Sequence, residues 1–152
     1  MSLGPETVQL SGAINEPGPL EWGRLRSLPE HSATVLLRCS TCDHKDERHD
    51  FTGVRLLDLL APILGYPADD SRRLRLSVVV SATDGYAATI AWGEIDPNFG
   101  NQPVMLAWHR DGAALPAGYG PLQLVVPGDE HSGRCVHGIA FIVVIVPLTN
   151  ND

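Results

Sequence analysis

Short runs in which apolar and polar residues alternate dominate the chain, and this period of two is typical of strands with one buried face. Clusters of proline, glycine, asparagine and aspartate separate the runs and mark turns. The Asp-Gly pairs at 84–85 and 111–112 predict two hairpins. In the last run we expect a break at Gly138, because an isolated glycine weakens a strand. The runs predict strands at residues 8–14, 33–38, 74–81, 86–92, 104–110, 113–115, 122–126 and 135–146.

Helical spacing of apolar residues is confined to two segments. Residues 55–65 carry leucines at helical intervals and end on Gly65, a residue type common at helix C-termini. Residues 20–28 form a shorter segment, which Pro29 ends because a proline disfavours a helical residue before it. The predicted structure is therefore mostly strand, with two helices.

A polar segment separates the second predicted strand from the longer helix. Residues 40–50 hold the single lysine of the chain, Lys45, and are predicted to form an exposed loop or hairpin tip. Cys39 lies immediately before this segment, at the end of the predicted strand 33–38. A side chain at a strand end is held more rigidly than one within a loop, so Cys39 is the cysteine best placed for chemistry.

Composition and charge restrict the classes of partner. The 152 residues and the 43% hydrophobic content suit one globular domain over residues 1–152. A net charge of −7 repels phosphate backbones and anionic surfaces, so we expect no nucleic-acid partner. Without an apolar run of about eighteen residues we also expect no membrane insertion. No signal-peptide pattern is visible, which makes the cytoplasm the default compartment and leaves a periplasmic or secreted location open.

Several short motifs occur in an order that resembles one known family. They are Leu37-Arg-Cys39, Phe51-Thr-Gly-Val54, Ser81-Ala-Thr-Asp-Gly-Tyr86, Asp111-Gly112, Gly120-Pro-Leu and Val125-Val-Pro-Gly128. Each is common by itself, and the resemblance rests on their order and spacing. Over about residues 8–146 the chain is similar to the molybdopterin-binding oxidoreductase domain of the sulfite oxidase family. This resemblance implies an α+β fold that is mostly β, with several mixed sheets and a few short helices.

The resemblance also implies a molybdenum–molybdopterin cofactor. In the family one protein thiolate and the dithiolene of the pterin hold the metal, and Cys39 occupies the position of that thiolate. The metal transfers an oxygen atom to or from a small substrate while electrons leave one at a time. A small-molecule substrate and an electron-transfer partner protein are therefore expected. Tyr119, in a predicted loop, is the polar aromatic residue expected to face the catalytic pocket.

The glycine-containing loop 127–134 is where the resemblance puts part of the binding of the pterin phosphate. Backbone N–H groups of Gly128, Ser132 and Gly133 are expected to face that phosphate, and Arg134 to pair with it through two hydrogen bonds.

Some positions depart from the sulfite-oxidising members of the family. After the cysteine the chain continues Ser40-Thr-Cys-Asp-His44, where those members usually have Ala-Gly-Asn-Arg. Gln123 stands where an arginine is often found. A site for sulfite needs clustered positive charge to offset the desolvation of an oxyanion. We therefore do not expect sulfite to be the substrate.

Two alternatives remain open. The three cysteines are too few and odd in number for a disulfide framework. The pattern Cys39-x2-Cys42-x-His44-x4-His49 could form a zinc site, although the single residue between Cys42 and His44 hinders tetrahedral ligation. The chain could also be a member of the same fold that lacks the cofactor and acts as a binding or interaction module, with the segment 39–49 structural or metal-binding.

Overall fold

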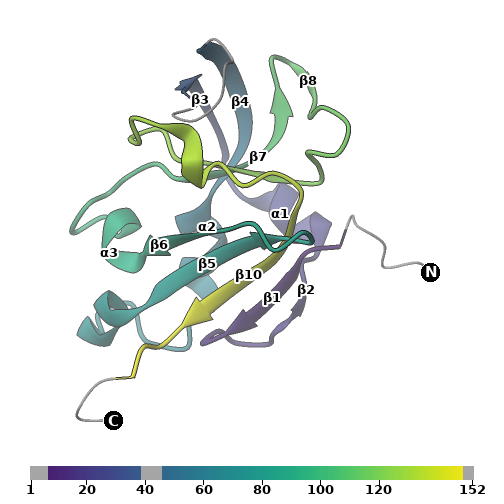
Figure 1. Cartoon of the computed structure of the whole chain (residues 1–152). Coiled ribbons are helices and arrows are strands. Elements are labelled where there is room, and N and C mark those ends of the chain that lie inside the picture. The colour runs from purple at the N-terminus through teal and green to yellow at the C-terminus, as the bar shows by residue number, and fades with distance from the viewer. Residues whose placement is uncertain (1–6, 39–45, 149–152) are drawn as a thin grey trace.

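The structure, a computed structural model, describes residues 7–38 and 46–148. Its strands form two sheets, which Figure 1 shows one above the other. The first sheet consists of β1 (Gln9–Gly12), β2 (Gly18–Pro19), β5 (Ser77–Ala82), β6 (Ala87–Ala91) and β10 (Ile139–Ile145). Its strand order is β2-β1-β10-β5-β6, with β1 and β10 parallel and the other neighbours antiparallel, so this sheet is mixed.

The second sheet is antiparallel throughout. It contains β3 (Glu30–Leu37), β4 (Glu47–Arg55), β7 (Met105–Arg110), β8 (Ala113–Ala114) and β9 (Gln123–Val125). The order is β3-β4-β7-β8, and β9 also pairs with β7. The turn between β7 and β8 has positive φ at both Asp111 and Gly112, as the Asp-Gly pair predicts for a tight hairpin.

The helices are short. They are α1 (Trp22–Ser27), α2 (Leu56–Leu60), α3 (Trp92–Ile95) and the 3-10 turns η1 (Ala61–Ile63), η2 (Ser71–Arg75) and η3 (Ser132–Arg134). None of the helices in the described ranges is long and apolar enough to cross a bilayer. The predicted α+β class, mostly strand with a few short helices, is confirmed.

Every predicted strand is present with shifted ends, whereas β2, β4 and α3 lie where no such element was predicted. The predicted helix 55–65 becomes α2 followed by η1, because Pro62 cannot donate to an α-helical ladder. The predicted strand 135–146 begins only at Ile139, after Gly138 with φ +64°, so the expected break is confirmed. The polar segment 40–50 is not all loop, because β4 begins at Glu47 and pairs with the end of β3. Pairing with a neighbouring strand overrides its polar character.

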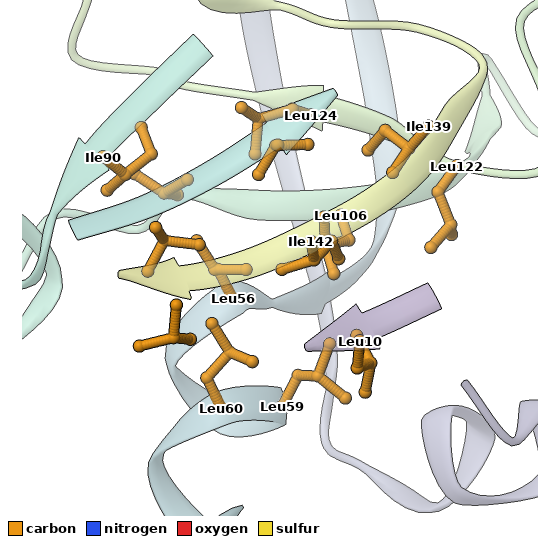
Figure 2. Close-up of a cluster of buried hydrophobic side chains, with 14 of the residues drawn as sticks. Leu10, Leu56, Leu59, Leu60, Ile90, Leu106, Leu122, Leu124, Ile139 and Ile142 are labelled. Carbon is orange, nitrogen blue, oxygen red and sulfur yellow. The ribbon is translucent and has the colours of Figure 1, made fainter. Parts of the chain in front are cut away.

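The core lies between the two sheets. Figure 2 shows the leucines of α2 packed beneath β10, with Leu106 and Leu124 of the second sheet nearby. Leu56, Leu59 and Leu60 are fully buried, which fixes α2 at the centre of the molecule. A smaller cluster lies on the opposite face of the second sheet and consists of Val35, Phe51, Met105, Ala107 and Val125. The second sheet is therefore apolar on both faces, and Leu37 at the end of β3 packs against the smaller cluster.

Candidate functional site

A cavity of about 380 Å³ lies beside the end of β3, at Leu37, over the smaller apolar cluster. We call it the site cavity. The turn between β5 and β6, the segment before β9, β9 itself and the connection from β9 to β10 supply the rest of its wall. Its described lining residues are Leu37, Asp84, Tyr86, Tyr119, Gln123, Ser132, Cys135 and His137. Segments that are far apart in the sequence thus meet next to the position that precedes Cys39.

The end of β3 is fixed by the connection between β9 and β10. The backbone N–H and the hydroxyl of Ser132 both donate to the carbonyl oxygen of Arg38, at 2.8 and 2.7 Å. Arg38 is the residue before Cys39, and it also forms ion pairs with Asp46 and Glu130, at 3.5 and 3.9 Å. Cys39 itself, together with Cys42 and His44, lies outside the described residues. The two bonds from Ser132 hold the last described residue of this strand end in place.

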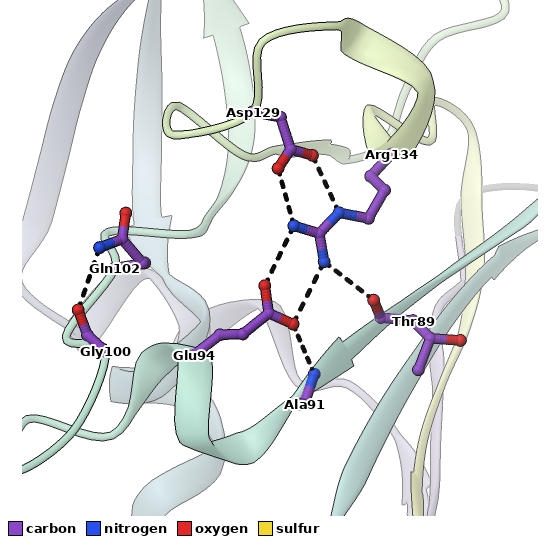
Figure 3. Close-up of polar contacts among 7 residues, drawn as sticks. All are labelled: Thr89, Ala91, Glu94, Gly100, Gln102, Asp129 and Arg134. Carbon is purple, nitrogen blue, oxygen red and sulfur yellow. Dashed lines mark hydrogen bonds and ion pairs between the residues drawn. The ribbon is translucent and has the colours of Figure 1, made fainter.

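Arg134 lies at the centre of a hydrogen-bonded cluster that we call the Arg134 network. Its guanidinium donates to Asp129 at 2.8 and 2.9 Å and to Glu94 at 3.0 and 3.2 Å. A further bond reaches the backbone carbonyl of Thr89 at 3.1 Å (Figure 3). The hydrogen bonds that the guanidinium donates to Asp129 and Glu94 raise the pKa of Arg134, so it carries a positive charge. The network ties the loop 127–134 to β6 and α3.

The residues predicted to bind a phosphate differ in how far their hydrogen-bond donors are already used and in how crowded their surroundings are. Ser132 donates both its N–H and its O–H to Arg38, and Arg134 faces two carboxylates, so an anion would have to compete for these donors. Gly133 faces open space, with no atom within 4 Å of where a Cβ would lie. Gly128 faces the side chain of Gln102, whose Oε1 would lie 2.8 Å from such a Cβ. The phosphate site stays a prediction, and Gly133 is the member with the freest surroundings.

Tyr119 and His137 stack on each other in the wall of the site cavity, with ring centroids 4.0 Å apart and an interplanar angle of 11°. The N–H of Gly138 donates to the carbonyl of Tyr119 at 2.7 Å and holds the two segments together. The guanidinium of Arg110 lies 5.9 Å from the centroid of the Tyr119 ring. The predicted pocket residue Tyr119 thus does line the cavity, as one half of an aromatic pair.

Gln123 is the lining residue whose importance the sequence did not reveal. Its side chain is 2% exposed, and its Oε1 has no hydrogen-bond partner among the described residues. In β9 its backbone pairs with Ala107 and His137. These pairings fix the strand but give the side-chain amide oxygen no hydrogen-bond donor. The only sequence signal was its presence at a position where the related family often has an arginine.

Cys135 also lines the cavity, but its environment differs from that of a reactive thiol. Burial raises the pKa of the Cys135 thiol, and its proximity to Asp129 adds to the rise. The neutral thiol is a poor nucleophile and a poor metal ligand, because both roles need the thiolate. Cys135 is therefore a wall residue rather than a second candidate for Cys39.

The zinc alternative can be followed at His49 only. Its Nδ1 lies 2.7 Å from Oδ2 of Asp111 and its Nε2 lies 2.9 Å from Oε2 of Glu47. Both ring nitrogens thus face carboxylates: Asp111 links β4 to the turn between β7 and β8, whereas Glu47 belongs to β4 itself. Among the residues that the structure describes, no group of three or more His, Cys, Asp or Glu side chains could hold a metal ion.

Comparisons with known proteins agree with this geometry. The family model described as the oxidoreductase molybdopterin binding domain matches residues 6–143. Among solved structures, the sulfane dehydrogenase SoxCD from Paracoccus pantotrophus is similar, with a TM-score of 0.73 and 17% sequence identity. The match covers 97% of this chain and 40% of that one, so the chain spans less than half the length of that relative. No curated protein matches. Neither the family model nor the solved structure points to zinc.

Proposed function

The chain belongs to the family of oxidoreductase molybdopterin binding domains, and from this premise we propose that it transfers an oxygen atom to or from a small substrate. In this proposal Cys39 is the protein thiolate that holds molybdenum in the site cavity. The single observation that supports it most directly is the meeting of the strand end before Cys39 with a cavity that contains an unpartnered buried amide.

The described residues fit such a cofactor. The cavity is large enough for part of a drug-sized group and has one apolar wall and several polar side chains, as cofactor sites commonly do. The unpartnered Oε1 of Gln123 leaves room for a hydrogen-bond donor of a substrate bound beside the cofactor. Gly133 leaves space at the loop where a Cβ would otherwise stand.

When bound, a molybdenum–molybdopterin cofactor supplies two-electron oxygen-atom transfer coupled to one-electron exchange with a partner. The residues of the chain bind and orient the reactants. Ser132 fixes the strand end that carries Cys39, so the thiolate meets the metal at a defined position. Leu37, which packs against the smaller apolar cluster, supplies an apolar side chain to the cavity wall. Tyr119 presents its hydroxyl from the wall, where it can donate a hydrogen bond to the oxygen of a substrate.

The loop 127–134 holds the phosphate of the pterin in this proposal. Its glycines, Gly128 and Gly133, offer backbone N–H groups, and Ser132 stands between the loop and β3. Arg134 contributes through the shape of the loop and through a positive charge near the bound anion, because its donors are already shared between two carboxylates. Since electrons move one at a time, we propose a partner protein that accepts or delivers them.

Molybdenum content per chain tests the proposal. The protein is purified from a host able to make and insert the pterin cofactor, and its metals are measured by elemental mass spectrometry. We expect near-stoichiometric molybdenum in the wild type and its loss in Cys39→Ser. The matched control is Cys42→Ser, which removes a neighbouring thiol and should keep the metal. Molybdenum that survives in Cys39→Ser contradicts the assignment, and a wild type without molybdenum favours the cofactor-free binding module instead.

A further inference from the structure

We infer that Gln123 sets the substrate selectivity of the site cavity, so that the cavity accepts uncharged polar molecules with a hydrogen-bond donor and rejects oxyanions. This inference rests on the proposed function only in taking the cavity as the substrate site. Three observations on the described residues carry it: the buried amide of Gln123, the charge of the cavity wall, and the partners of the arginines around it.

The amide of Gln123 lacks a hydrogen-bond partner that its burial requires. Burial leaves 2% of the residue exposed, and Oε1 has no donor near it in the described parts of the chain. A buried polar group without a partner destabilises a fold, and native structures keep such groups mainly where a ligand or water serves them. Because Gln123 lines the site cavity and has no partner among the described residues, we assign its partner to a molecule bound in the cavity. That molecule must carry an N–H or O–H group to serve an amide oxygen.

The wall of the cavity does not suit an anion. Among its described lining residues there is no lysine and no arginine, whereas Asp84 contributes a carboxylate. His137 is the one imidazole among the described lining residues, and its ring is stacked against Tyr119. An oxyanion that enters would lose water and gain no fixed cation in return, which is strongly unfavourable.

The arginines around the cavity are directed to other groups. Arg134 faces Asp129 and Glu94, and the ion pairs of Arg38 are with Asp46 and Glu130. Arg110, the last residue of β7, places its guanidinium over the ring of Tyr119. Among the described residues each of these guanidinium groups already has at least one such contact, although Nε of Arg38 is buried without a hydrogen-bond partner.

The neutral side-chain amide of Gln123 can therefore distinguish between uncharged and anionic ligands. With its oxygen and its NH₂ group it can accept one hydrogen bond and donate another, and it adds no charge. An uncharged ligand with a donor and an acceptor can form hydrogen bonds with both the oxygen and the NH₂ group of this amide. An oxyanion offers acceptors only, so Oε1 keeps no hydrogen-bond donor. Gln123 thus disfavours oxyanions, because their binding leaves its buried amide oxygen without a hydrogen bond.

The test compares two probes, acetamide and sulfate, on protein as purified. Binding is followed by NMR titration of ¹⁵N-labelled protein, reading the side-chain amide signals of Gln123, which the Gln123 variants identify. We expect acetamide to shift these signals and sulfate to leave them unchanged. In Gln123→Arg sulfate should bind roughly tenfold to a hundredfold more tightly than in the wild type, the range expected for one charged hydrogen bond.

Gln9→Arg is the matched control. It makes the same change of charge at a glutamine of β1, in the first sheet and outside the described lining of the cavity, and it should leave sulfate binding as in the wild type. Sulfate that binds to the wild type and shifts the amide of Gln123, or acetamide that leaves the amide unaffected, overturns the inference. If Gln123→Arg does not fold, the wild-type comparison of the two probes decides alone. Neither readout needs molybdenum, so a chain without the metal refutes the proposed function and leaves this selectivity measurable.

Discussion

Removal of the guanidinium of Arg134 should destabilise the chain far more than removal of an exposed arginine. In Arg134→Ala two carboxylates, those of Asp129 and Glu94, would face each other and the carbonyl of Thr89 without their common donor. The loop 127–134 would lose its attachment to β6 and α3. We expect the free energy of unfolding to fall by about 2 kcal/mol.

The magnitude follows from burial. Breaking a fully buried ion pair by removing one partner costs roughly 3–5 kcal/mol, and an exposed pair contributes below about 1 kcal/mol. The side chains of Arg134, Asp129 and Glu94 keep 30, 25 and 34% of their exposure, so solvent screens part of the interaction and the expected loss lies between these limits. Arg134→Lys should recover only part of it, because an ammonium group cannot bind two carboxylates and a carbonyl in the plane of a guanidinium.

Urea unfolding followed by tryptophan fluorescence measures the loss, since Trp92 is fully buried in the folded state. The matched control is Arg72→Ala, which removes another arginine paired with a carboxylate, that of Asp70, at an exposed position. It should shift the urea midpoint much less. Equal shifts for the two variants would show that the Arg134 network adds nothing beyond a surface ion pair and would refute the reasoning.

Three further outcomes are expected. Gly53→Ala should destabilise the chain by about 3 kcal/mol in urea unfolding, because its methyl group would overlap the backbone of β7, whereas Gly23→Ala, with nothing within 4 Å, should be neutral or stabilising; equal effects would contradict this. The thiol of Cys135 should react with a thiol reagent at pH 8 more slowly in folded than in denatured protein by peptide mapping, since burial raises its pKa; equal rates would oppose that cause. Hydrogen bonds from Arg72 lower the pKa of Asp70 to about 2. The contribution of Asp70 to stability, present above about pH 4, should therefore be lost as the pH falls towards 2. In Asp70→Asn, stability measured against pH should lack this part of the loss, and an unchanged loss of stability in acid would argue against it.

Local signals in the sequence were sufficient to predict most of the fold. The Asp-Gly pair at 111–112 predicted a hairpin because only a few residue types accept positive φ at both turn positions. The leucines of α2 gave a helix, and the break at Gly138 followed from one residue. The strand β4 was missed, because its pairing with β3 depends on a neighbour that local polarity does not report.

The strand that precedes Cys39 is present, and Tyr119 lies in the wall of a cavity, but the roles assigned to these residues stay predictions. The partners of Arg134 could not be predicted, because Glu94 lies 40 positions away in the sequence and no local pattern connects the two. The burial of Gln123 could not be foreseen either, since a glutamine in a short apolar strand is read as an outward-facing residue until both faces of the sheet are known to be covered.

The coordination of molybdenum by the Cys39 thiolate is tested most directly by X-ray absorption at the molybdenum edge of the loaded protein. The account predicts that molybdenum in the wild type has one sulfur neighbour more than the pterin dithiolene supplies, and that any metal remaining in Cys39→Ser lacks it. Cys135→Ser should leave the spectrum unchanged, because the thiol of Cys135 is held neutral by burial. Identical sulfur coordination in the wild type and Cys39→Ser would contradict the account.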